Sequence, residues 1–434
     1  MITNDIERYN TDFDRYQRAA MDFVHRYPFT MLMDERHIDY STACVREGVD
    51  INVCLIGFGK INQHVFLTSV ETNQFVTKCA GGVRHKPVMY HVFDKDVIEK
   101  RKKLDDTYYR YRNECKSVDA SRYLPLPDMP AIEQYYPMDV NDVVFYDTMR
   151  AVVCKSEKDV NLAIVAVGTD EENVALANNL VAKMCKPDVN NVAVFAYVRG
   201  EWDSKKVLNS RNCFLFGENI QFNSACDIYK MAQHRNKLYA QAKGIADVDW
   251  TEKDEIKKQS SICACLSLRY KLNMMGLDCS ISNCYFHLKD KKFRLDERTP
   301  VSKDDYFKRY AFDDDISCRE SGNSLRKTFA IMEHYRWNAF MITKGFVPAT
   351  VEQIVNETVD VDGKIKHTNG TRYQEHRHGN LTTFDGLIDF GKLVAQRDNV
   401  SEEEADVIKY DYQLMDDAYE IIEQDSTYKI VERS

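Results

Sequence analysis

The chain has 434 residues, more than one ordinary domain needs, so two or three domains are expected. Hydrophobic residues make up 44% and charged residues 29%, a composition typical of a soluble globular protein. The formal net charge of -9 argues against a general nucleic-acid-binding protein, which would carry a basic surface. No apolar stretch approaches the roughly 20 residues of a membrane-spanning helix, and the N-terminus is acidic, unlike a signal peptide. We therefore expect a cytoplasmic protein with no nucleic-acid partner and no membrane insertion, and leave a membrane-bound partner open.

Residues 1–48 are predicted to form a mainly helical lead-in, because Tyr16, Ala20 and Phe23 recur at helical spacing. From residue 49 to about residue 240, apolar runs alternate with helical stretches. The runs predicted as strands lie within 51–59, 87–96, 142–147, 161–170, 191–200 and 212–218. Continuous apolar strands that alternate with helices indicate a parallel sheet covered on both faces. The predicted fold class is therefore α/β, with a Rossmann-like domain at 49–240.

Strands are predicted to be rare after residue 240. Amphipathic helices are expected at 222–244, at 260–276 with Gly276 as its C-terminal cap, at 324–345 and at 401–424. Residues 241–323 would connect the Rossmann-like domain to a mainly α-helical C-terminal domain at 324–434.

A glycine turn follows the first predicted strand. Gly57 would permit a tight turn, Gly59 would let backbone N–H groups approach a phosphate, and the next helix would point its positive end at that anion. The third glycine position of the motif is occupied by Asn62, which would either loosen the packing of helix on strand or add a polar contact. The turn predicts a nucleotide site.

Two further segments belong to this predicted site. Asp94 ends the second strand, where a carboxylate can accept hydrogen bonds from ribose hydroxyls and would repel a 2′-phosphate. Gly168, Thr169 and Asp170 follow a later strand and are expected beside the turn. The expected cofactor is NAD or another adenine nucleotide; the alternative is a Rossmann-like domain that has lost its ligand.

The strand–glycine turn–helix unit, the strand that ends in Asp-Lys-Asp and the later AVGTDEENVALANNLV together resemble the TrkA-N or RCK type of Rossmann domain. The resemblance covers about 170 residues. It implies a ligand-gated regulatory domain more than a dehydrogenase, with Gly57, Gly59 and Asp94 at the ligand, and it implies a homodimer. The family usually has Gly or Ala where Asn62 stands.

A cluster of polar and aromatic residues occupies the helix predicted at 324–345. Its members are Glu333, His334, Arg336, Trp337 and Asn338. Such a helix could hold a planar base, with Trp337 stacking, Arg336 as a planar cation, and His334 and Asn338 forming hydrogen bonds. The alternative is a core helix anchored by Trp337 that contains a buried, hydrogen-bonded histidine.

This helix and the segments after it resemble the bacterial form of the ryanodine-receptor repeat (RyR) domain. The matching positions are Glu333, His334, Arg336, Trp337, Gly345, His378, Leu381 and Leu387, with Phe346 where the family has Trp. The order of the two domains also matches that of proteins that join a TrkA-N domain to an RyR domain. Arg372 and His378 fall in a basic loop that could contact a ligand phosphate; the alternative is a solvated loop.

Metal binding and covalent catalysis have weaker support. The 13 cysteines are scattered and are expected to be reduced and buried. The residues nearest to a zinc pattern are Cys263, Cys265, Cys279, Cys284 and His287. Their spacing fits no paired C-x2-C arrangement, so no metal site is predicted, and the sequence predicts no catalytic residues.

The sequence therefore predicts a nucleotide-sensing regulatory protein. The Rossmann-like domain would bind an adenine nucleotide or dinucleotide, and the RyR-like domain would bind a second small molecule, such as a signalling nucleotide. The resemblance implies a setting in bacterial or phage-defence signalling. Two alternatives stay open: an NAD-dependent oxidoreductase or nucleotide hydrolase that uses His334 or His378 as a base, and a structural interaction module with degenerate sites.

Overall fold

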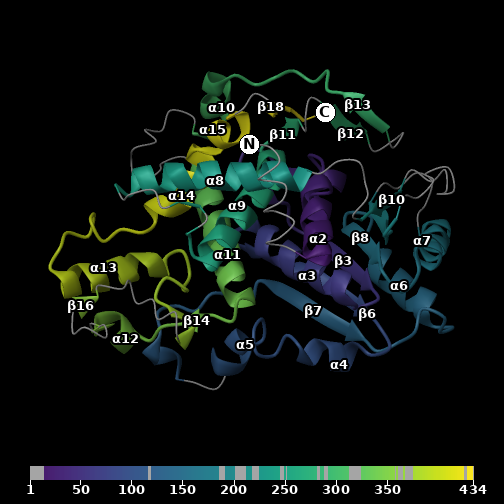
Figure 1. The fold of residues 1–434 in the computed structure, drawn as a ribbon, viewed down its shortest axis with the longest axis horizontal. Coiled ribbons are helices and arrows are strands. Elements are labelled where there is room, and N and C mark those ends of the chain that lie inside the picture. The colour runs from purple at the N-terminus through teal and green to yellow at the C-terminus, as the bar shows by residue number, and fades with distance from the viewer. Residues whose placement is uncertain are drawn as a thin grey trace.

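The structure is a computed structural model, and it describes residues 14–115, 119–184, 191–200, 212–217, 224–244, 249–250, 252–280, 284–287, 292–311, 324–356, 358–359, 365–366, 375–424 and 428–433. It is an α/β protein with a six-stranded, all-parallel sheet in its N-terminal half and a mostly helical C-terminal region (Figure 1). No described helix combines the length and the apolar character that crossing a membrane requires.

The main sheet has the strand order β10-β9-β8-β3-β6-β7, and all neighbours are parallel. Its strands are β3 (Ile51–Ile56), β6 (Val88–Phe93), β7 (Ala131–Tyr136), β8 (Val160–Val165), β9 (Val192–Tyr197) and β10 (Cys213–Phe216). Counted along the chain, this is the order 6-5-4-1-2-3 of the Rossmann fold. The α/β prediction for this part of the chain is confirmed.

One predicted strand is wrong. Residues 142–147 form a turn and the start of helix α6 (Phe145–Val153), and the third strand of the sheet is β7 instead. Phe145 and Met149 are buried four residues apart, which is helical spacing. The edge strand β7 is only partly buried, so its sequence lacks the continuous apolar run that marks the central strands.

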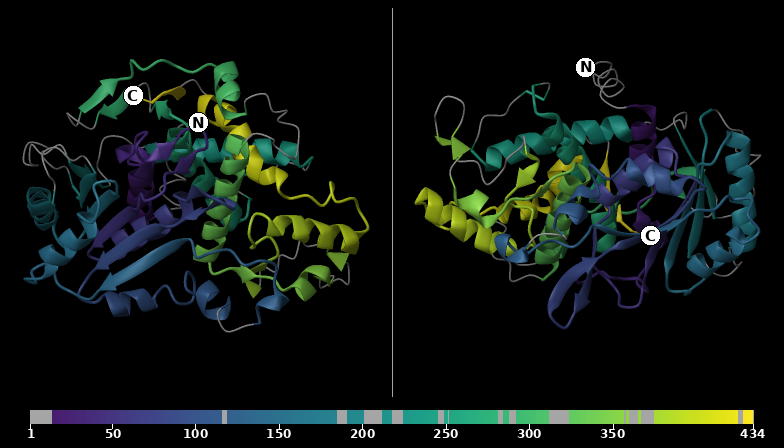
Figure 2. Two further views of the ribbon diagram at one scale, coloured as in Figure 1. Left: turned by 180° about the vertical axis from the view of Figure 1, so that it is seen from behind. Right: turned by 90° about the horizontal axis from the view of Figure 1, so that it is seen from below.

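Helices cover both faces of the sheet (Figure 2). On one face, α6 and α7 (Asp170–Met184) pack on side chains such as Val194. On the other face lie α2 (Arg15–Arg26), α3 (Lys60–Thr72), α8 (Ser224–Ala242) and α9 (Glu255–Met274). Phe23 of α2 packs on Phe195 and Phe216, with ring centroids 5.1 and 4.8 Å apart. The N-terminal lead-in is thus part of the Rossmann-like core.

A second, four-stranded sheet lies beside the first. It has the order β1-β2-β4-β5 and is built from β1 (Ile38–Asp39), β2 (Cys44–Val45), β4 (Phe75–Cys79) and β5 (Gly82–Lys86). The lead-in predicted as mainly helical is therefore helical only in α2 and a 3-10 turn at Phe29–Leu32; its residues 1–13 lie outside the described part. In the sequence, the β4–β5 hairpin lies between the glycine turn and Asp94.

The C-terminal region is mostly helical. Its helices are α10 (Lys303–Tyr310), α11 (Ser324–Thr343), α12 (Val351–Val355), α13 (Gly386–Asp398), α14 (Lys409–Asp416) and α15 (Ala418–Glu423). Short strand pairs accompany them: β11 (Leu277–Ser280) with β18 (Lys429–Glu432), β12 (Cys284–His287) with β13 (Lys292–Leu295), β14 (Val347–Pro348) with β17 (Arg377–His378), and β15 (Thr358–Val359) with β16 (Ile365–Lys366).

In the N-terminal half, the short helices α4 (Val97–Lys102) and α5 (Arg110–Cys115) and a 3-10 turn at Ala120–Arg122 precede β7.

Most predicted helices of this region are confirmed. Helices α8, α9 and α11 match the stretches 222–244, 260–276 and 324–345, and Gly276 takes the left-handed conformation that ends α9 (φ 76°). The single helix predicted at 401–424 is wrong: residues 401–408 are turns and irregular backbone, and the rest is divided into α14 and α15 at Asp417.

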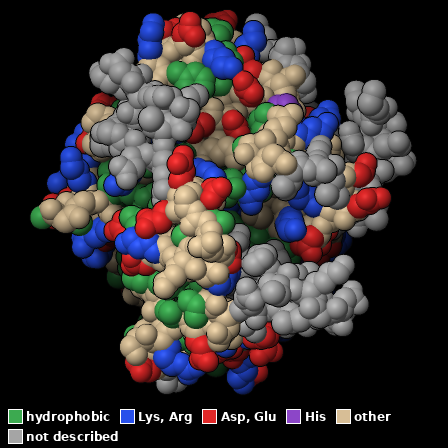
Figure 3. Space-filling view, turned by 90° about the vertical axis from the view of Figure 1, so that its left-hand side faces the viewer, with side chains coloured by type: hydrophobic (Ala, Val, Ile, Leu, Met, Phe, Trp, Pro, Cys, Tyr) green, Lys and Arg blue, Asp and Glu red, His purple; other side chains and the backbone are tan. Residues whose placement is uncertain are grey.

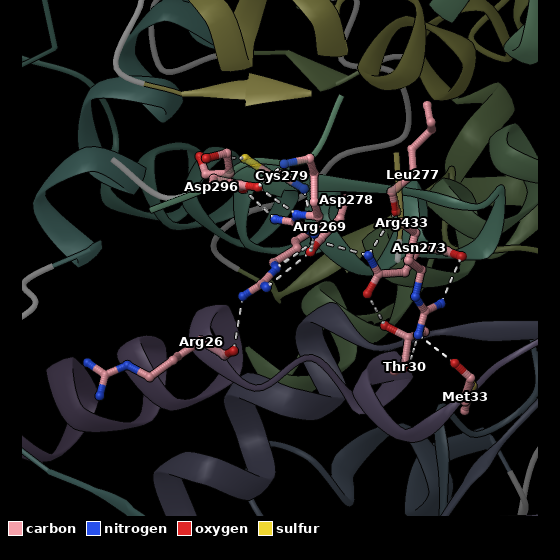
Figure 4. Close-up of polar contacts among 12 residues, drawn as sticks. Arg26, Thr30, Met33, Arg269, Asn273, Leu277, Asp278, Cys279, Asp296 and Arg433 are labelled. Carbon is pink, nitrogen blue, oxygen red and sulfur yellow. Dashed lines mark hydrogen bonds and ion pairs between the residues drawn. The ribbon is translucent and has the colours of Figure 1, made fainter. Parts of the chain in front are cut away.

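Helix α11 runs through the middle of the molecule, where it packs on α3, α9 and α14 (Figure 1). Polar contacts also join distant parts of the chain (Figure 4). Asp278 forms ion pairs with Arg269 and Arg298 at 2.9 and 2.7 Å, and Arg269 donates to the carbonyl oxygen of Arg26. Near the C-terminus, Arg433 donates to the carbonyl oxygen of Thr30. These contacts fix α2, α9 and the C-terminal strand relative to one another.

Candidate functional site

The glycine turn has the geometry that its sequence predicts. Gly57 has a positive φ of 79°, and a Cβ there would lie 2.5 Å from the carbonyl oxygen of Ala166 at the end of β8. Only glycine fits this close approach of two backbones. A Cβ on Gly59 would meet open space, and no side chain caps the start of α3, which begins directly after it. The first N–H groups of α3 therefore have no N-cap side chain as a hydrogen-bond partner.

Asp94 supports this turn from inside. Its carboxylate accepts the N–H of Phe58 at 2.6 Å and the N–H of Asp96 at 2.8 Å, and it pairs with the Lys100 ammonium at 2.6 Å. Burial raises the pKa of Asp94, but these contacts outweigh burial and hold the pKa below its ordinary value. The carboxylate predicted to bind ribose is thus engaged by the protein itself.

Asn62 also points inward. It is fully buried, and its amide nitrogen donates to the carbonyl oxygens of Gly57 at 2.6 Å and of Ile56 and Ile164 at 3.2 Å. Of the two effects expected for a side chain here, the structure has the polar contact. Asn62 connects the turn to β8 and does not face the open side of Gly59.

The loop after β8 lies next to this turn but caps its own helix. The N–H of Thr169 donates to Glu172 at 2.8 Å, and Asp170 accepts the N–H groups of Arg199 and Gly200 at 2.9 and 3.2 Å. A Cβ on Gly168 would collide with Glu172. The segment Gly168–Asp170 is therefore brought to the turn, as predicted, with its polar groups already bonded within the protein.

A cavity of about 630 Å³ lies elsewhere, between α8, the start of α9, α11 and the start of α14. Its volume suits a nucleotide-sized ligand. Four of the residues predicted for the RyR-like site contribute to its wall: Glu333, His334, Trp337 and His378. On the side of the molecule where α12 and α13 lie, acidic and basic side chains are mixed over the surface (Figure 3). Selectivity for a charged ligand would therefore come from the cavity itself.

Aromatic rings and cations share the cavity wall. Trp337 packs edge-to-face on His378, with ring centroids 4.8 Å apart, and lies nearly parallel to His334. At the end of α8, the ammonium of Lys243 lies 4.5 Å from the ring centroid of Tyr239 and 4.3 Å from that of Tyr410. Burial lowers the pKa of Lys243, while Tyr410 opposes this shift.

Basic side chains from α8, the turn after it and α9 line the cavity. Among the described residues, Arg235, Lys243 and Lys257 form no ion pair, although Arg235 donates to Ser261 at 3.3 Å. Of the acidic wall residues, Glu333 pairs with Lys271 and Asp411 with His334, whereas Glu252 and Asp254, near the start of α9, form no ion pair with a described residue. An anionic group of a ligand would find uncompensated cations here.

His334 is held at both ring nitrogens. Nε2 lies 2.8 Å from the carbonyl oxygen of Thr382, so it carries a proton and donates, and Nδ1 lies 3.1 Å from the carboxylate of Asp411. Burial raises the pKa of Asp411, and His334 opposes the shift. His334 therefore has no ring nitrogen left to act as a base on a ligand.

His378 is also in a fixed state. Burial, together with Lys243 and His334, lowers its pKa to about 3, so the ring is neutral at pH 7. Its Nδ1 accepts the N–H of Asn380 at 3.1 Å, which places the proton on Nε2. His378 can donate a hydrogen bond, but its lone pair is occupied.

Glu333, on the cavity wall, belongs to a buried ionic triad with Lys271 and Arg336. Its carboxylate lies 2.5 Å from the Lys271 ammonium and 2.8 Å from the Arg336 guanidinium. Burial raises the pKa of Glu333, but Arg336 and Lys271 outweigh burial and hold it at about 2. Burial lowers the pKa of Lys271 to about 8, against the opposing effect of Glu333.

The remaining predicted residues have different positions. Arg336 is fully buried in the triad, and Asn338 donates to the carbonyl oxygen of Thr382 at 2.8 Å, so neither lines the cavity. Arg372 lies outside the described residues. No group of three potential ligands for a metal ion occurs in the described ranges.

Sequence reasoning missed the half of the cavity wall that comes from outside the RyR-like region. Arg235 and Tyr239 lie on α8, in the predicted Rossmann-like domain, Lys243 directly follows α8, and Lys257 lies on α9. The spacing of Arg235, Tyr239 and Lys243, four residues apart, places them on one side of a helix and could have indicated a shared surface.

Comparison with known proteins gives no match: no family model, no curated protein and no solved structure is significantly similar to the chain.

Proposed function

We propose that the protein is a nucleotide-sensing regulator whose principal ligand site is the cavity beside α11. The observation that carries the proposal is that Trp337 and His334, predicted from the sequence to bind a base, line one cavity with His378, predicted to contact a phosphate. Lys243 and Arg235, which form no ion pair with described residues, line the same cavity. A planar ring would stack on Trp337, and phosphates would contact the cations. The ligand class is a signalling nucleotide.

The glycine turn is proposed as a second, adenine (di)nucleotide site. The open side of Gly59 and the uncapped start of α3 support a phosphate there. Because Asp94 is engaged with Phe58 and Lys100, its contribution would be to shape the turn, and a ribose contact would require Lys100 to move. The proposal keeps the resemblance to TrkA-N and RyR domains, and with it a homodimer and a role in bacterial or phage-defence signalling.

Binding is favoured over catalysis. The enzyme alternatives relied on His334 or His378 as a base, and both histidines use their acceptor capacity within the protein. A bound nucleotide is therefore expected to be released unchanged.

The test is a thermal-shift screen with NAD, ATP, ADP-ribose and cyclic nucleotides, followed by calorimetry on each hit. A ligand at 100 times its Kd should stabilise the protein by about 2.7 kcal/mol. Trp337→Ala should weaken binding at the cavity, while Gly59→Ala, which changes only the turn, should leave it intact. The proposal fails if no nucleotide stabilises the protein, or if Trp337→Ala binds every hit as tightly as the parent protein does.

A further inference from the structure

One side of α8 brings two cations and a tyrosine ring to the cavity. Arg235, Tyr239 and Lys243 recur every four residues, and all three line the cavity. The N–H of Lys243 donates to the carbonyl oxygen of Tyr239 at 3.1 Å, so Lys243 continues the last turn of the helix. The Cα atoms of Arg235 and Lys243 are therefore separated by about 12 Å along the helix axis. We call these three residues the α8 row.

Both cations of the α8 row lie close to the ring of Tyr239. The Cζ atom of Arg235 is 5.9 Å from the ring centroid, and the Nζ atom of Lys243 is 4.5 Å from it. Neither cation forms an ion pair with a described residue. Two positive charges beside one ring repel each other, and negative charge placed between them is attracted to both. The α8 row therefore favours a ligand whose anionic part lies along Tyr239.

The two cations are held at different walls of the cavity. Arg235 donates to the hydroxyl group of Ser261, on α9, at 3.3 Å. The ammonium of Lys243 lies 4.3 Å from the ring centroid of Tyr410, on α14. An anionic group that extends along the α8 row can contact both cations while each keeps its place at its own wall.

Lys243 lies beside the proposed position of the base. The ring of His378 packs on Trp337, with centroids 4.8 Å apart. Lys243 is near this pair of rings, because its charge adds to burial in lowering the pKa of His378. A nucleotide whose base stacks on Trp337 would therefore bring its first phosphate to Lys243, and Arg235 lies two helical turns further along α8.

Building on the proposed function, we propose that the cavity binds a nucleotide with a chain of at least two phosphates, which extends along the α8 row from Lys243 to Arg235. The phosphate next to the ribose accepts from Lys243, and the second phosphate accepts from Arg235. The hydroxyl group of Tyr239, which has no hydrogen-bond partner among the described residues, donates to the chain between them. A nucleoside monophosphate would leave Arg235 without an anion.

The experiment compares the monophosphate and the diphosphate of each common nucleoside: AMP with ADP, GMP with GDP, CMP with CDP, and UMP with UDP. Inorganic pyrophosphate is the probe that lacks a base. Calorimetry in buffer without divalent cations gives the ratio of the two Kd values of each pair. It is measured for the parent protein, Arg235→Ala, Arg235→Lys, Lys243→Ala and Lys237→Ala. Lys237 is a matched control, because it is an exposed lysine of α8 that does not line the cavity. Thermal unfolding of each variant verifies that it folds.

In at least one pair, the diphosphate should bind the parent protein at least about tenfold more tightly than the monophosphate, because the second phosphate gains a charge-assisted hydrogen bond from Arg235. Arg235→Ala should reduce this preference about fivefold or more, and Arg235→Lys, which keeps the charge, should retain more of it. Lys243→Ala should weaken both members of the pair by a similar factor. Lys237→Ala should change neither.

Two results would overturn the phosphate chain and leave the proposed function standing: equal binding of both members of every pair by the parent protein, or an unchanged preference in Arg235→Ala. Failure of every nucleotide to bind overturns the proposed function, and the phosphate chain with it. Pyrophosphate that binds as tightly as the best diphosphate does the same, because the base would then contribute nothing to binding.

Discussion

Removing the carboxylate of the buried triad tests how the centre of the molecule is stabilised. Lys271 and Arg336 are fully buried and share Glu333, at 2.5 and 2.8 Å. Glu333→Gln keeps the shape of the side chain but leaves two buried cations without an anion. Breaking a buried ion pair in this way costs about 3–5 kcal/mol of unfolding free energy.

The structure also sets an upper limit on the part of this loss of unfolding free energy that comes from Lys271. Arg336 stays charged, but Lys271 can release its proton, because burial already lowers its pKa to about 8. Releasing a proton at pH 7 from a lysine with an ordinary pKa near 10.5 costs about 5 kcal/mol, so the contribution of Lys271 cannot exceed this value. At pH values above the lowered pKa of Lys271, the unfolded variant binds more protons than the folded variant does. Stability should therefore rise with pH, by up to about 1.4 kcal/mol per unit between pH 7 and pH 9.

Urea unfolding at pH 7, 8 and 9, followed by fluorescence and circular dichroism, measures both effects. The two probes must give the same transition for a free energy to be defined. Glu99→Gln is a matched control, because Glu99 pairs with Lys102 at 2.7 Å on the surface, where its side chain is 73% exposed. The control should lose less than about 1 kcal/mol. The reasoning is refuted if Glu333→Gln loses no more than the control, or if its stability does not rise with pH.

Other predictions concern the glycine turn and α2. Gly57→Ala should lower the unfolding free energy by more than about 3 kcal/mol in urea, because its Cβ would collide with the Ala166 carbonyl at a positive φ; full stability would contradict the geometry of the turn. Gly59→Ala should leave the melting temperature unchanged and weaken any nucleotide that calorimetry finds at the turn. Burial lowers the pKa of His25 to about 3, from an ordinary value of 6.5. Above pH 6.5 His25 is neutral in the folded and the unfolded chain, and its contribution to stability is fully present. As the pH falls below 6.5, the unfolded chain binds a proton that the folded chain does not. This lowers the free energy of unfolding by about 1.4 kcal/mol at pH 5.5. His25→Leu should reduce the loss of stability between pH 7.5 and 5.5 by about this amount, and an unchanged loss would contradict the role of His25.

The sequence was most informative where burial is complete. Central strands such as β3 and β8 are buried on both faces, and their unbroken apolar runs predicted a parallel sheet. The edge strand β7 has one face exposed, so its mixed sequence does not predict a strand, whereas the apolar turn at the start of α6 resembles one. The short strands β1 and β2 contain two residues each and leave no periodic pattern.

The candidate sites show the same division. Local geometry was predictable: Gly57 needs a positive φ, and Trp337, His334 and Glu333 share a helix. The contacts of the polar groups were not predictable from the sequence. Asp94, for example, is bonded to Lys100 and Phe58 because of the loop geometry, which residue spacing does not encode. The cavity depends on tertiary packing, which brings α8 against α11 and α14.

The central claim is that a nucleotide binds in the cavity beside α11, and a crystal structure of the protein with the tightest-binding nucleotide of the screen tests it most directly. The account predicts the base stacked on Trp337 and the phosphates near Lys243 and Arg235. A nucleotide bound only at the glycine turn, with the cavity empty, would contradict it.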